Sequence, residues 1–144
     1  MQKIYLDNCC FNRPYDDQNQ FFIKIETDAK LRIQDSIKQN EYTLIWSFIL
    51  DYENNFNTPD KSKSISKWKE LAKISIKSNN EIITIAREII KTGIKNKDAL
   101  HLASAIHAQA DFFLTVDNRV LKYKDNRILI LNPIEFIERE GYHE

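Results

Sequence analysis

One stretch constrains this chain more than any other: a helical pattern that begins near Asn96, followed by a short apolar run that ends at Asp117. Asn96 is a favourable N-cap, which predicts that Asp98 lies in the first helical turn. Apolar residues then recur at helical spacing and form a face that is mostly alanine: Ala99, Leu102, Ala103 and Ile106. The run from Phe112 to Val116 is typical of a strand covered on both faces. One carboxylate therefore opens a helix, and another closes a strand.

The composition favours a single domain spanning residues 1–144. With 144 residues, of which 42% are apolar, the chain can bury a sizeable core. Two glycines and three prolines are too few for a sandwich or barrel with many tight turns. No apolar run is long enough for a membrane helix, and Asp7 stands where a signal peptide would still be apolar. We therefore expect a cytoplasmic protein with no membrane association. The adjacent Cys9 and Cys10 predict no disulfide framework.

Strand and helix patterns alternate along the chain. The expected strands cover residues 3–6, 41–46, 74–76, 112–116 and 127–131. Helices are expected over 19–39, 48–54, 61–72, 80–92, 96–106, 118–122 and from Pro133 onward, whereas 8–18 is expected to be a loop. This order predicts an α/β fold: a mainly parallel sheet of four to five strands with helices on both faces, as a three-layer α/β/α sandwich.

Four acids follow from this arrangement at one edge of the sheet. Asp7 and Asp117 come directly after expected strands, Asp98 opens a helix, and Glu53 lies in the helix after the second strand. In an open α/β sheet, functional groups lie outside the carboxyl ends of the strands. Four carboxylates need a compensating charge, which Mg²⁺ or Mn²⁺ supplies while taking oxygen ligands. Asp51, two residues before Glu53, competes for the same role, although it would face elsewhere on a helix.

The strings around these acids resemble the motifs of the PIN-domain family. The three clearest are Ile4-Tyr5-Leu6-Asp7, Lys97-Asp98-Ala99-Leu100-His101-Leu102-Ala103-Ser104-Ala105 and Phe113-Leu114-Thr115-Val116-Asp117. Residues 47–53 resemble the family's looser second motif, and the similarity extends to the closing strand at 128–133. PIN domains are α/β/α sandwiches whose acidic cluster binds Mg²⁺ or Mn²⁺ and cuts RNA. Many small bacterial members are VapC-type toxins of toxin–antitoxin pairs.

The resemblance implies a metal-dependent ribonuclease that hydrolyses RNA phosphodiester bonds, with water activated by the metal as the nucleophile. Carried over residue by residue, Asp7, Glu53, Asp98 and Asp117 take the catalytic and metal-binding roles. Asp7 and Asp98 would be the principal ligands, while Glu53 and Asp117 would bind a second metal or orient the water. The resemblance also implies three kinds of partner: an RNA substrate, a cognate antitoxin and a second copy of the chain.

Other readings of the same residues give alternatives. The family commonly has Thr or Ser after the first acid and then Ser or Asn, whereas this chain has Asn8 and Cys9. A thiol is a poor hydrogen-bonding substitute there, so the alternative is a degenerate PIN domain that binds RNA or a protein without cutting. A receiver-type signalling domain would need a lysine where Asn132 stands, and a dehalogenase-like phosphatase would need an acid at position 9.

A net charge of zero hides a basic middle part of the chain. Residues 61–97 contain 10 Lys and Arg against 3 Asp and Glu, whereas residues 1–60 contain 6 against 10. This asymmetry suits a surface for a polyanion, although the same lysines can form only a solvated face. The expected phosphate contacts are Lys61, Lys63, Lys67, Lys69, Lys73 and Lys77, with Arg13 as a weaker candidate. His101 can point at the metal of Asp98 or make only a hydrogen bond within the fold.

Overall fold

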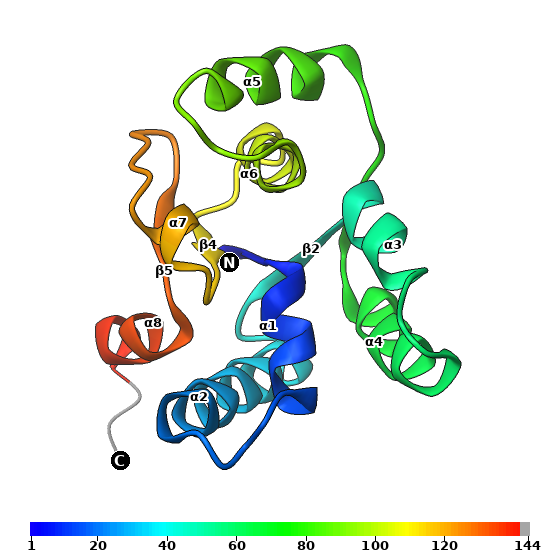
Figure 1. Cartoon of the computed structure of the whole chain (residues 1–144), viewed down its shortest axis with the longest axis vertical. Helices are drawn as coiled ribbons and strands as arrows, with labels where there is room; N and C mark the ends of the chain where they lie inside the picture. Colours follow the sequence, from blue (N-terminus) through cyan, green and yellow to red (C-terminus); the bar gives the residue numbers. More distant parts are fainter. Residues whose placement is uncertain (142–144) are drawn as a thin grey trace.

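The computed structural model describes residues 1–141 and contains a five-stranded sheet in which every neighbouring pair is parallel (Figure 1). The strands are β1 (Lys3–Leu6), β2 (Thr43–Ser47), β3 (Ile74–Ile76), β4 (Phe112–Leu114) and β5 (Leu129–Leu131). Their spatial order is β3-β2-β1-β4-β5, so the chain changes direction across the sheet between β1 and β4. Ligand sites in such sheets lie at this switch point, outside the carboxyl ends of the strands.

Helices cover both faces of the sheet, which confirms the predicted three-layer α/β/α sandwich (Figure 1). α5 and α6 lie on one side, and α2 and α8 pack together on the other. The described helices are α1 (Asn8–Asn12), the 3₁₀ helix η1 (Arg13–Tyr15), α2 (Phe21–Lys38), α3 (Phe48–Asn54), α4 (Pro59–Leu71), α5 (Asn80–Ile90), α6 (Asn96–His107), α7 (Asn118–Leu121) and α8 (Pro133–Glu140).

The core lies where α6 packs against the central strands. Ile4, Tyr5 and Leu6 of β1 are fully buried, as expected of a parallel strand covered on both faces. The small Ala99 and Ala103 of α6 are also fully buried. Alanines let two backbones approach closely, so α6 lies near the sheet and its first turn reaches the edge where β1 ends.

The segment expected to be a loop, residues 8–18, is partly helical. Asp7 caps α1 by accepting a hydrogen bond from the backbone N–H of Asn8 (2.8 Å), and α1 buries Cys10 and Phe11. Pro14 then lies in the first turn of η1, where its missing N–H costs nothing. The loop prediction was wrong because Asn, Pro and Asp favour helix ends as strongly as turns.

Two predicted helix caps lie one residue from the observed ones. Lys95, not Asn96, occupies the N-cap of α6 and makes no side-chain cap bond, although Asp98 remains in the first turn as predicted. In α5 the cap is Asn79, whose side chain accepts from the N–H of Ile82 (3.0 Å), rather than Asn80. When two polar residues are adjacent, the sequence pattern does not decide which one caps.

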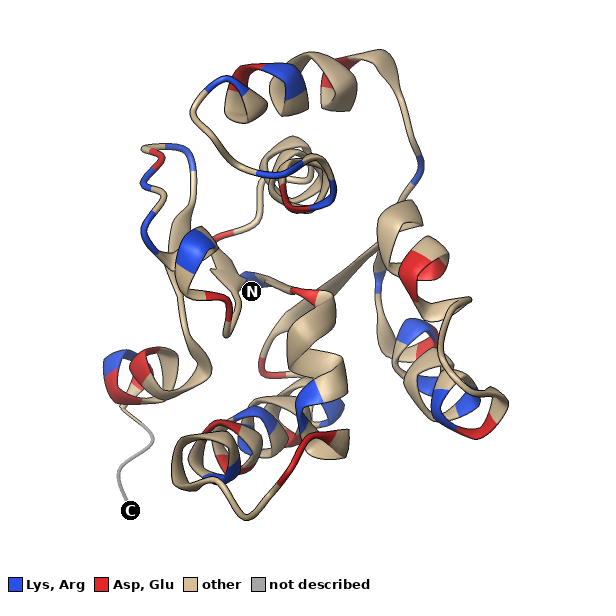
Figure 2. Ribbon diagram, viewed as in Figure 1, with Lys and Arg blue, Asp and Glu red and all other residues tan. Residues whose placement is uncertain are grey.

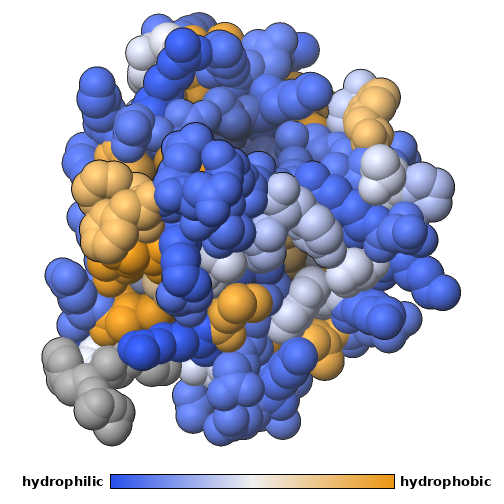
Figure 3. All heavy atoms as spheres, turned by 60° about the horizontal axis from the view of Figure 1, so that its bottom comes forward, coloured by the Kyte–Doolittle hydropathy of each residue, from blue (hydrophilic) through white to orange (hydrophobic). Residues whose placement is uncertain are grey.

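Within residues 1–141, no helix has the length and apolar character that crossing a membrane requires. The surface is mostly hydrophilic, with separate apolar patches (Figure 3). The most exposed large apolar side chains include Phe21, Phe22 and Phe56.

Candidate functional site

The four acids predicted from the sequence lie around one hollow at the carboxyl edge of the sheet. Asp7 follows β1, Asp117 follows β4, Glu53 lies on α3, and Asp98 lies in the first turn of α6. This hollow, the acid cleft, has a volume of about 370 Å³. Its lining residues are Asp7, Asn8, Cys9, Asn12, Asp16, Glu53, Asp98 and Asp117. Figure 2 shows acidic positions at the end of β1, on α3 and at the start of α6.

Asp7 is the most deeply placed of the four and is fixed from several sides. It is 5% exposed, and its Oδ2 accepts a hydrogen bond from the Thr115 hydroxyl at 2.8 Å. The Thr115 oxygen also accepts from the backbone N–H of Asp117 at 3.1 Å. Thr115 therefore links the first and fourth acids, a role that the sequence analysis did not assign. Its hydroxyl within the apolar run 112–116 is the signal that could have revealed it.

Cys9 contributes a thiol to the same group of side chains. Its Sγ lies 3.5 Å from Asp7 Oδ2 and 3.3 Å from Thr115 Oγ1. The hydrogen bond with Cys10, burial and the charge of Asp7 all raise the pKa of the Cys9 thiol well above its ordinary value. Cys9 therefore stays protonated and serves as a weak donor beside the Asp7 carboxylate.

Glu53 is held by a buried chain of hydrogen bonds that passes through His101. The Glu53 carboxylate is hydrogen-bonded to Nε2 of His101, and Nδ1 of that ring lies 2.6 Å from the Tyr5 hydroxyl. The Tyr5 oxygen lies 2.6 Å from Ser47 Oγ. His101 is 1% exposed and has both ring nitrogens engaged, so it makes the internal hydrogen bonds that the sequence analysis allowed as an alternative to metal binding.

His101 also partly compensates the negative charge of the acids. Burial lowers the pKa of its imidazole, but the charges of Asp7, Glu53 and Asp98 outweigh burial and raise the pKa overall. Nε2 lies 3.6 Å from Asp7 Oδ1 in addition to its bond with Glu53. When the ring is protonated it donates from both nitrogens, and Tyr5 then accepts from His101 and is free to donate to Ser47.

The charges of the acids act on one another across the cleft. Burial and the charges of Asp7, Asp117 and Glu53 together raise the pKa of Asp98 to about 6, although the charge of His101 lowers it. Like charges that raise a neighbour's pKa mark carboxylates held near one another against their repulsion. Such perturbed groups in a hollow are typical of functional sites.

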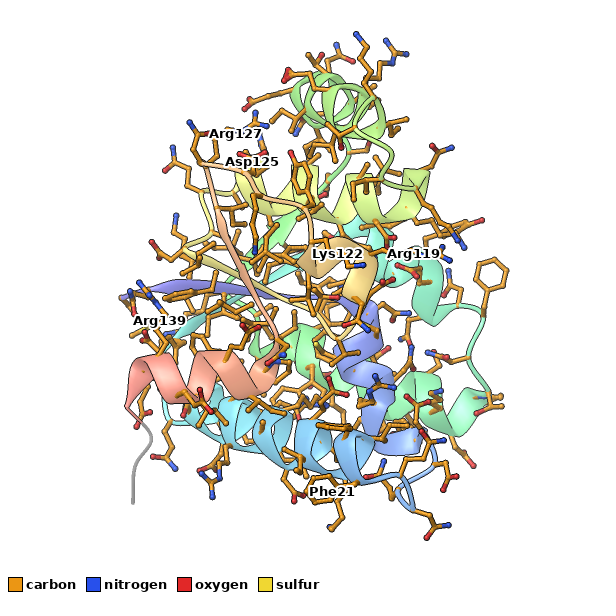
Figure 4. The ribbon with its side chains drawn as sticks, turned by 60° about the vertical axis from the view of Figure 1, so that its left-hand side comes forward. Phe21, Arg119, Lys122, Asp125, Arg127 and Arg139 are labelled. Atoms are coloured by element: carbon orange, nitrogen blue, oxygen red, sulfur yellow. The ribbon has the colours of Figure 1, made fainter. Side chains whose placement is uncertain are left out.

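Asp117 combines a structural role with a place in the cleft. Its Oδ1 caps α7 by accepting from the N–H of Arg119 at 2.9 Å. Arg119 lies on this short helix and Lys122 directly follows it; both are labelled in Figure 4. The same carboxylate lines the acid cleft, so capping α7 and facing the cleft are compatible.

The structure separates Asp51 from Glu53. Asp51 accepts a hydrogen bond from Nε1 of Trp46 at 2.8 Å and pairs with the Lys69 ammonium at 3.0 Å. These partners hold Asp51 away from the acid cleft, whose lining includes Glu53 but not Asp51. Residues two positions apart on a helix point about 200° away from each other around its axis. This explains why only one of the pair reaches the cleft.

The donor set of the cleft suits a hard divalent cation. Besides five carboxylates, those of the four predicted acids and of Asp16, it presents the amide oxygens of Asn8 and Asn12, which are buried and meet no hydrogen-bond donor among residues 1–141. Oxygen ligands of this kind are those that Mg²⁺ and Mn²⁺ take. As the side chains stand, however, no three His, Cys, Asp or Glu in the described part of the chain are placed to hold one ion together. Glu53 and Asp7 instead engage His101 and Thr115.

The lysines predicted to contact RNA lie away from the acid cleft, whereas Arg13 pairs with Asp16 of its lining. Figure 2 shows basic positions gathered along α4. Lys63 and Lys67 line a groove between α2 and α4, and the Lys61 ammonium lies 5.0 Å from the centre of the Tyr15 ring. Lys69 pairs with Asp51, and Arg13 pairs with Asp16 and Glu26. Within residues 1–141, none of these basic side chains lines the acid cleft.

Two lysines that the sequence analysis did not single out border the cleft. Lys95 and Lys97, with Asn96, line a second hollow that also includes Glu53 and Asp98. Lys95 is the N-cap of α6, and Lys97 lies in its first turn directly before Asp98. Their position next to Asp98 in the chain was the available signal.

The fold and the acid cleft together define a class of protein: a PIN-like three-layer sandwich with acids from several segments at the carboxyl edge of a parallel sheet. Among solved structures, the chain is similar to the crystal structure of VapBC2 from Rickettsia felis bound to a DNA fragment from their promoter. The similarity has a TM-score of 0.58 and 15% identity, and covers 91% of this chain and 98% of the other. No protein-family model and no curated protein sequence matches the chain. The likeness therefore shows the fold.

Proposed function

We propose that this protein is a metal-dependent ribonuclease that hydrolyses RNA phosphodiester bonds at the acid cleft. The observation that carries the proposal is that Asp7, Glu53, Asp98 and Asp117 line one hollow although they come from four separate segments. The likeness to a VapBC2 structure supports the same reading at the level of the fold. Bound Mg²⁺ or Mn²⁺ would supply positive charge at the scissile phosphate and lower the pKa of the attacking water.

The surroundings of each residue suggest its role in the proposed reaction. Asp7 and Asp98 would hold the cation, because Asp7 is fixed by Thr115 and Asp98 lies at the favourable N-terminal end of α6. Glu53 and Asp117 would bind a second cation or orient the water. His101 would hold Glu53 in position through the bond to Nε2 and offset part of the negative charge.

The experiment that tests this function is the cleavage of a labelled RNA with Mn²⁺ or Mg²⁺ and with a chelator, comparing the wild type with Asp98→Asn. The variant keeps the shape of the side chain but removes one charge from the cleft. Asp60→Asn is the matched control, because Asp60 is also an acid in the first turn of a helix but is exposed on α4. We expect cutting that needs metal, survives in Asp60→Asn and is lost in Asp98→Asn. Equal cutting by all three proteins would contradict the proposal.

We further propose that the protein acts in the cytoplasm as the toxin of a toxin–antitoxin pair, held inactive by a cognate antitoxin and forming homodimers. The support is the fold shared with a structure of VapBC2. Expression of the chain alone should arrest the growth of a bacterial host, and Asp98→Asn should relieve the arrest. Normal growth with wild-type protein that is active on RNA in vitro would remove the toxin role.

One feature favours a second candidate, a PIN domain that binds RNA or a protein without cutting. Cys9 places a thiol rather than a hydroxyl beside Asp7, at 3.5 Å. Binding of RNA without cleavage in any metal, together with no binding of Mn²⁺ at millimolar concentration, would support this candidate. Gain of cleavage in Cys9→Ser would then identify the thiol as the cause.

A further inference from the structure

An exposed aromatic pair lies beside the acid cleft. Tyr52 and Phe56 are 49% and 72% exposed, and their ring centres are 5.2 Å apart in an edge-to-face arrangement. Glu53, which lines the cleft, is the residue directly after Tyr52 on α3. Single exposed apolar side chains are common on protein surfaces, whereas two exposed rings in contact offer a wider apolar face on which a ligand can pack.

A lysine stands over both rings and connects them to the cleft. The Lys97 ammonium is 5.6 Å from the centre of the Tyr52 ring and 6.0 Å from that of Phe56. Lys97 and Lys95 also line the second hollow, of about 510 Å³, which shares Glu53 and Asp98 with the acid cleft. The rings, the lysines and the acids therefore form one continuous surface across α3 and the start of α6.

The chemistry of this surface fits an unpaired nucleotide. Bases of any sequence stack on exposed aromatic rings, and stacking needs a base whose face is open, which a duplex does not offer. The ammonium groups of Lys95 and Lys97 match the phosphates on either side of such a base. They also place positive charge where a polyanion would otherwise meet only carboxylates, so charge complementarity favours a nucleic acid over an apolar protein segment.

We propose that Tyr52 and Phe56, with Lys95 and Lys97, form a subsite that stacks an unpaired base of a single-stranded nucleic acid and holds its neighbouring phosphates at the rim of the acid cleft. The subsite rests on the proposed function for the role of the adjacent acids. Binding at the subsite does not require cleavage, so the two can be tested separately.

The experiment measures the binding of a short single-stranded RNA that carries one 2-aminopurine, whose fluorescence falls when the base stacks. The titration is made in chelator, so that no cleavage occurs. We expect quenching with wild type, and at least about fivefold weaker binding with loss of quenching in the double variant Tyr52→Ala/Phe56→Ala. Tyr52→Trp should retain the quenching, because tryptophan also presents a stacking face.

The chain offers a matched control in Phe21 and Phe22. These rings are 71% and 73% exposed, with centres 5.6 Å apart, again in an edge-to-face arrangement. They lie at the start of α2, on the other side of the sheet from α6, and Figure 4 labels Phe21 there. Phe21→Ala/Phe22→Ala should leave binding and quenching unchanged. Lys95→Gln/Lys97→Gln should weaken binding and flatten its dependence on salt.

Each outcome bears on the subsite separately from the nuclease. Quenching that depends on Tyr52 and Phe56 in a protein that never cleaves RNA supports the subsite and removes the proposed function. Cleavage by wild type together with unchanged binding by Tyr52→Ala/Phe56→Ala overturns the subsite and leaves the function standing. A change of oligomeric state with no change in RNA binding overturns the subsite in favour of a protein contact. A titration with single-stranded DNA tests whether the surface also accepts unpaired DNA bases. A titration with duplex RNA tests stacking, because equal affinity for the duplex contradicts it.

Discussion

At the scale of single residues, the charged carboxylate of Asp98 lowers the stability of the folded protein. Its pKa is about 6 in the folded protein against an ordinary 3.8, so between these pH values the folded state binds the proton more tightly than the unfolded state. Stability is therefore lost as pH rises through this window. In chelator at pH 7, Asp98→Asn should raise the free energy of unfolding by about 1 kcal/mol, allowing for solvent around a half-buried group.

Urea denaturation measures this effect, and Asp60→Asn again provides the control. Asp60 also lies in the first turn of a helix but is exposed, so its loss should lower stability by about 0.5 kcal/mol through the helix dipole. Near pH 4, where Asp98 is protonated in the folded state, the gain from Asp98→Asn should largely disappear. A gain of the same size at both pH values would show that repulsion among the acids is not its cause.

Thr115 permits a second prediction about the cleft. Its hydroxyl donates to Asp7 at 2.8 Å and accepts from the Asp117 N–H, so it fixes two of the acids at once. Thr115→Val keeps the shape but removes both bonds, and should weaken Mn²⁺ binding about 10- to 100-fold by calorimetry. Thr115→Ser should restore it, and Thr84→Val, at an exposed position on α5, should have no effect. Wild-type affinity in Thr115→Val would exclude this positioning role.

The residues of the cleft divide into those that sequence reasoning reaches and those that it does not. Acids at the ends of strands are visible because strand ends can be read from apolar runs. Asp7 directly follows β1 as predicted, whereas β4 ends at Leu114, three residues before Asp117. Thr115 and Tyr5 were missed because each lies inside such a run, where its neighbours suggest burial but not its partner. The choice between Asp51 and Glu53 needed the contact of Asp51 with Trp46.

At the scale of elements, α2 and α4 enclose a lysine that opposes their packing. Lys30 of α2 is 3% exposed, and its ammonium lies 5.5 Å from the Phe11 ring centre and 5.8 Å from that of Trp68 on α4. Burial lowers the pKa of Lys30 to about 8. The contacts with the rings therefore stabilise the charge less than the water lost on burial did. Below that pH the folded protein carries this cost in full.

Replacing Lys30 should therefore stabilise the junction. Lys30→Met keeps the length of the side chain and should raise the free energy of unfolding at pH 7 by about 1–2 kcal/mol. The gain should shrink as pH rises from about 8 towards 10.5, because the wild-type lysine becomes neutral in the folded state first. Lys38→Met, at an exposed position whose ammonium lies 5.1 Å from the same Trp68 ring centre, should change stability by less than about 1 kcal/mol. A pH-independent gain in Lys30→Met would point to packing rather than charge.

Element boundaries show why local patterns predict elements better than their ends. Pro133 begins α8 as expected, because Asn132 and Glu135 form a complete capping box around it. The cap of α6 was misplaced by one residue, since Lys95 fills it with no side-chain bond and tertiary packing decides the start. The helical turns at 8–15 were missed because they are short and gain their stability from burying Phe11 rather than from a periodic pattern.

At the scale of the whole molecule, the sequence predicts the layers and the parallel sheet but not how surfaces face one another. Alternation of strands and helices allows few topologies, and the observed order β3-β2-β1-β4-β5 is among them. The α4 lysines were expected near the acids because they dominate the charge of the middle part. They lie instead on a helix that packs beside α2, with Lys63 and Lys67 on that groove, and only three-dimensional packing decides this.

The assembly of the cleft from distant segments leads to a prediction about the stability of the whole fold. Asp7, Glu53, Asp98 and Asp117 are brought together only by folding, so a cation that they hold binds the folded state and not the unfolded chain. At 100 times its dissociation constant, Mn²⁺ should therefore stabilise the wild type by about 2.7 kcal/mol, which raises the melting temperature by about 5–10 °C. Asp98→Asn should lose most of this shift, and sodium chloride at matched ionic strength should not reproduce it. Once Asp98 is neutral, the remaining acids repel one another less, so a cation bound among them should stabilise the fold less. An equal shift in wild type and Asp98→Asn would therefore mean that the ion binds elsewhere.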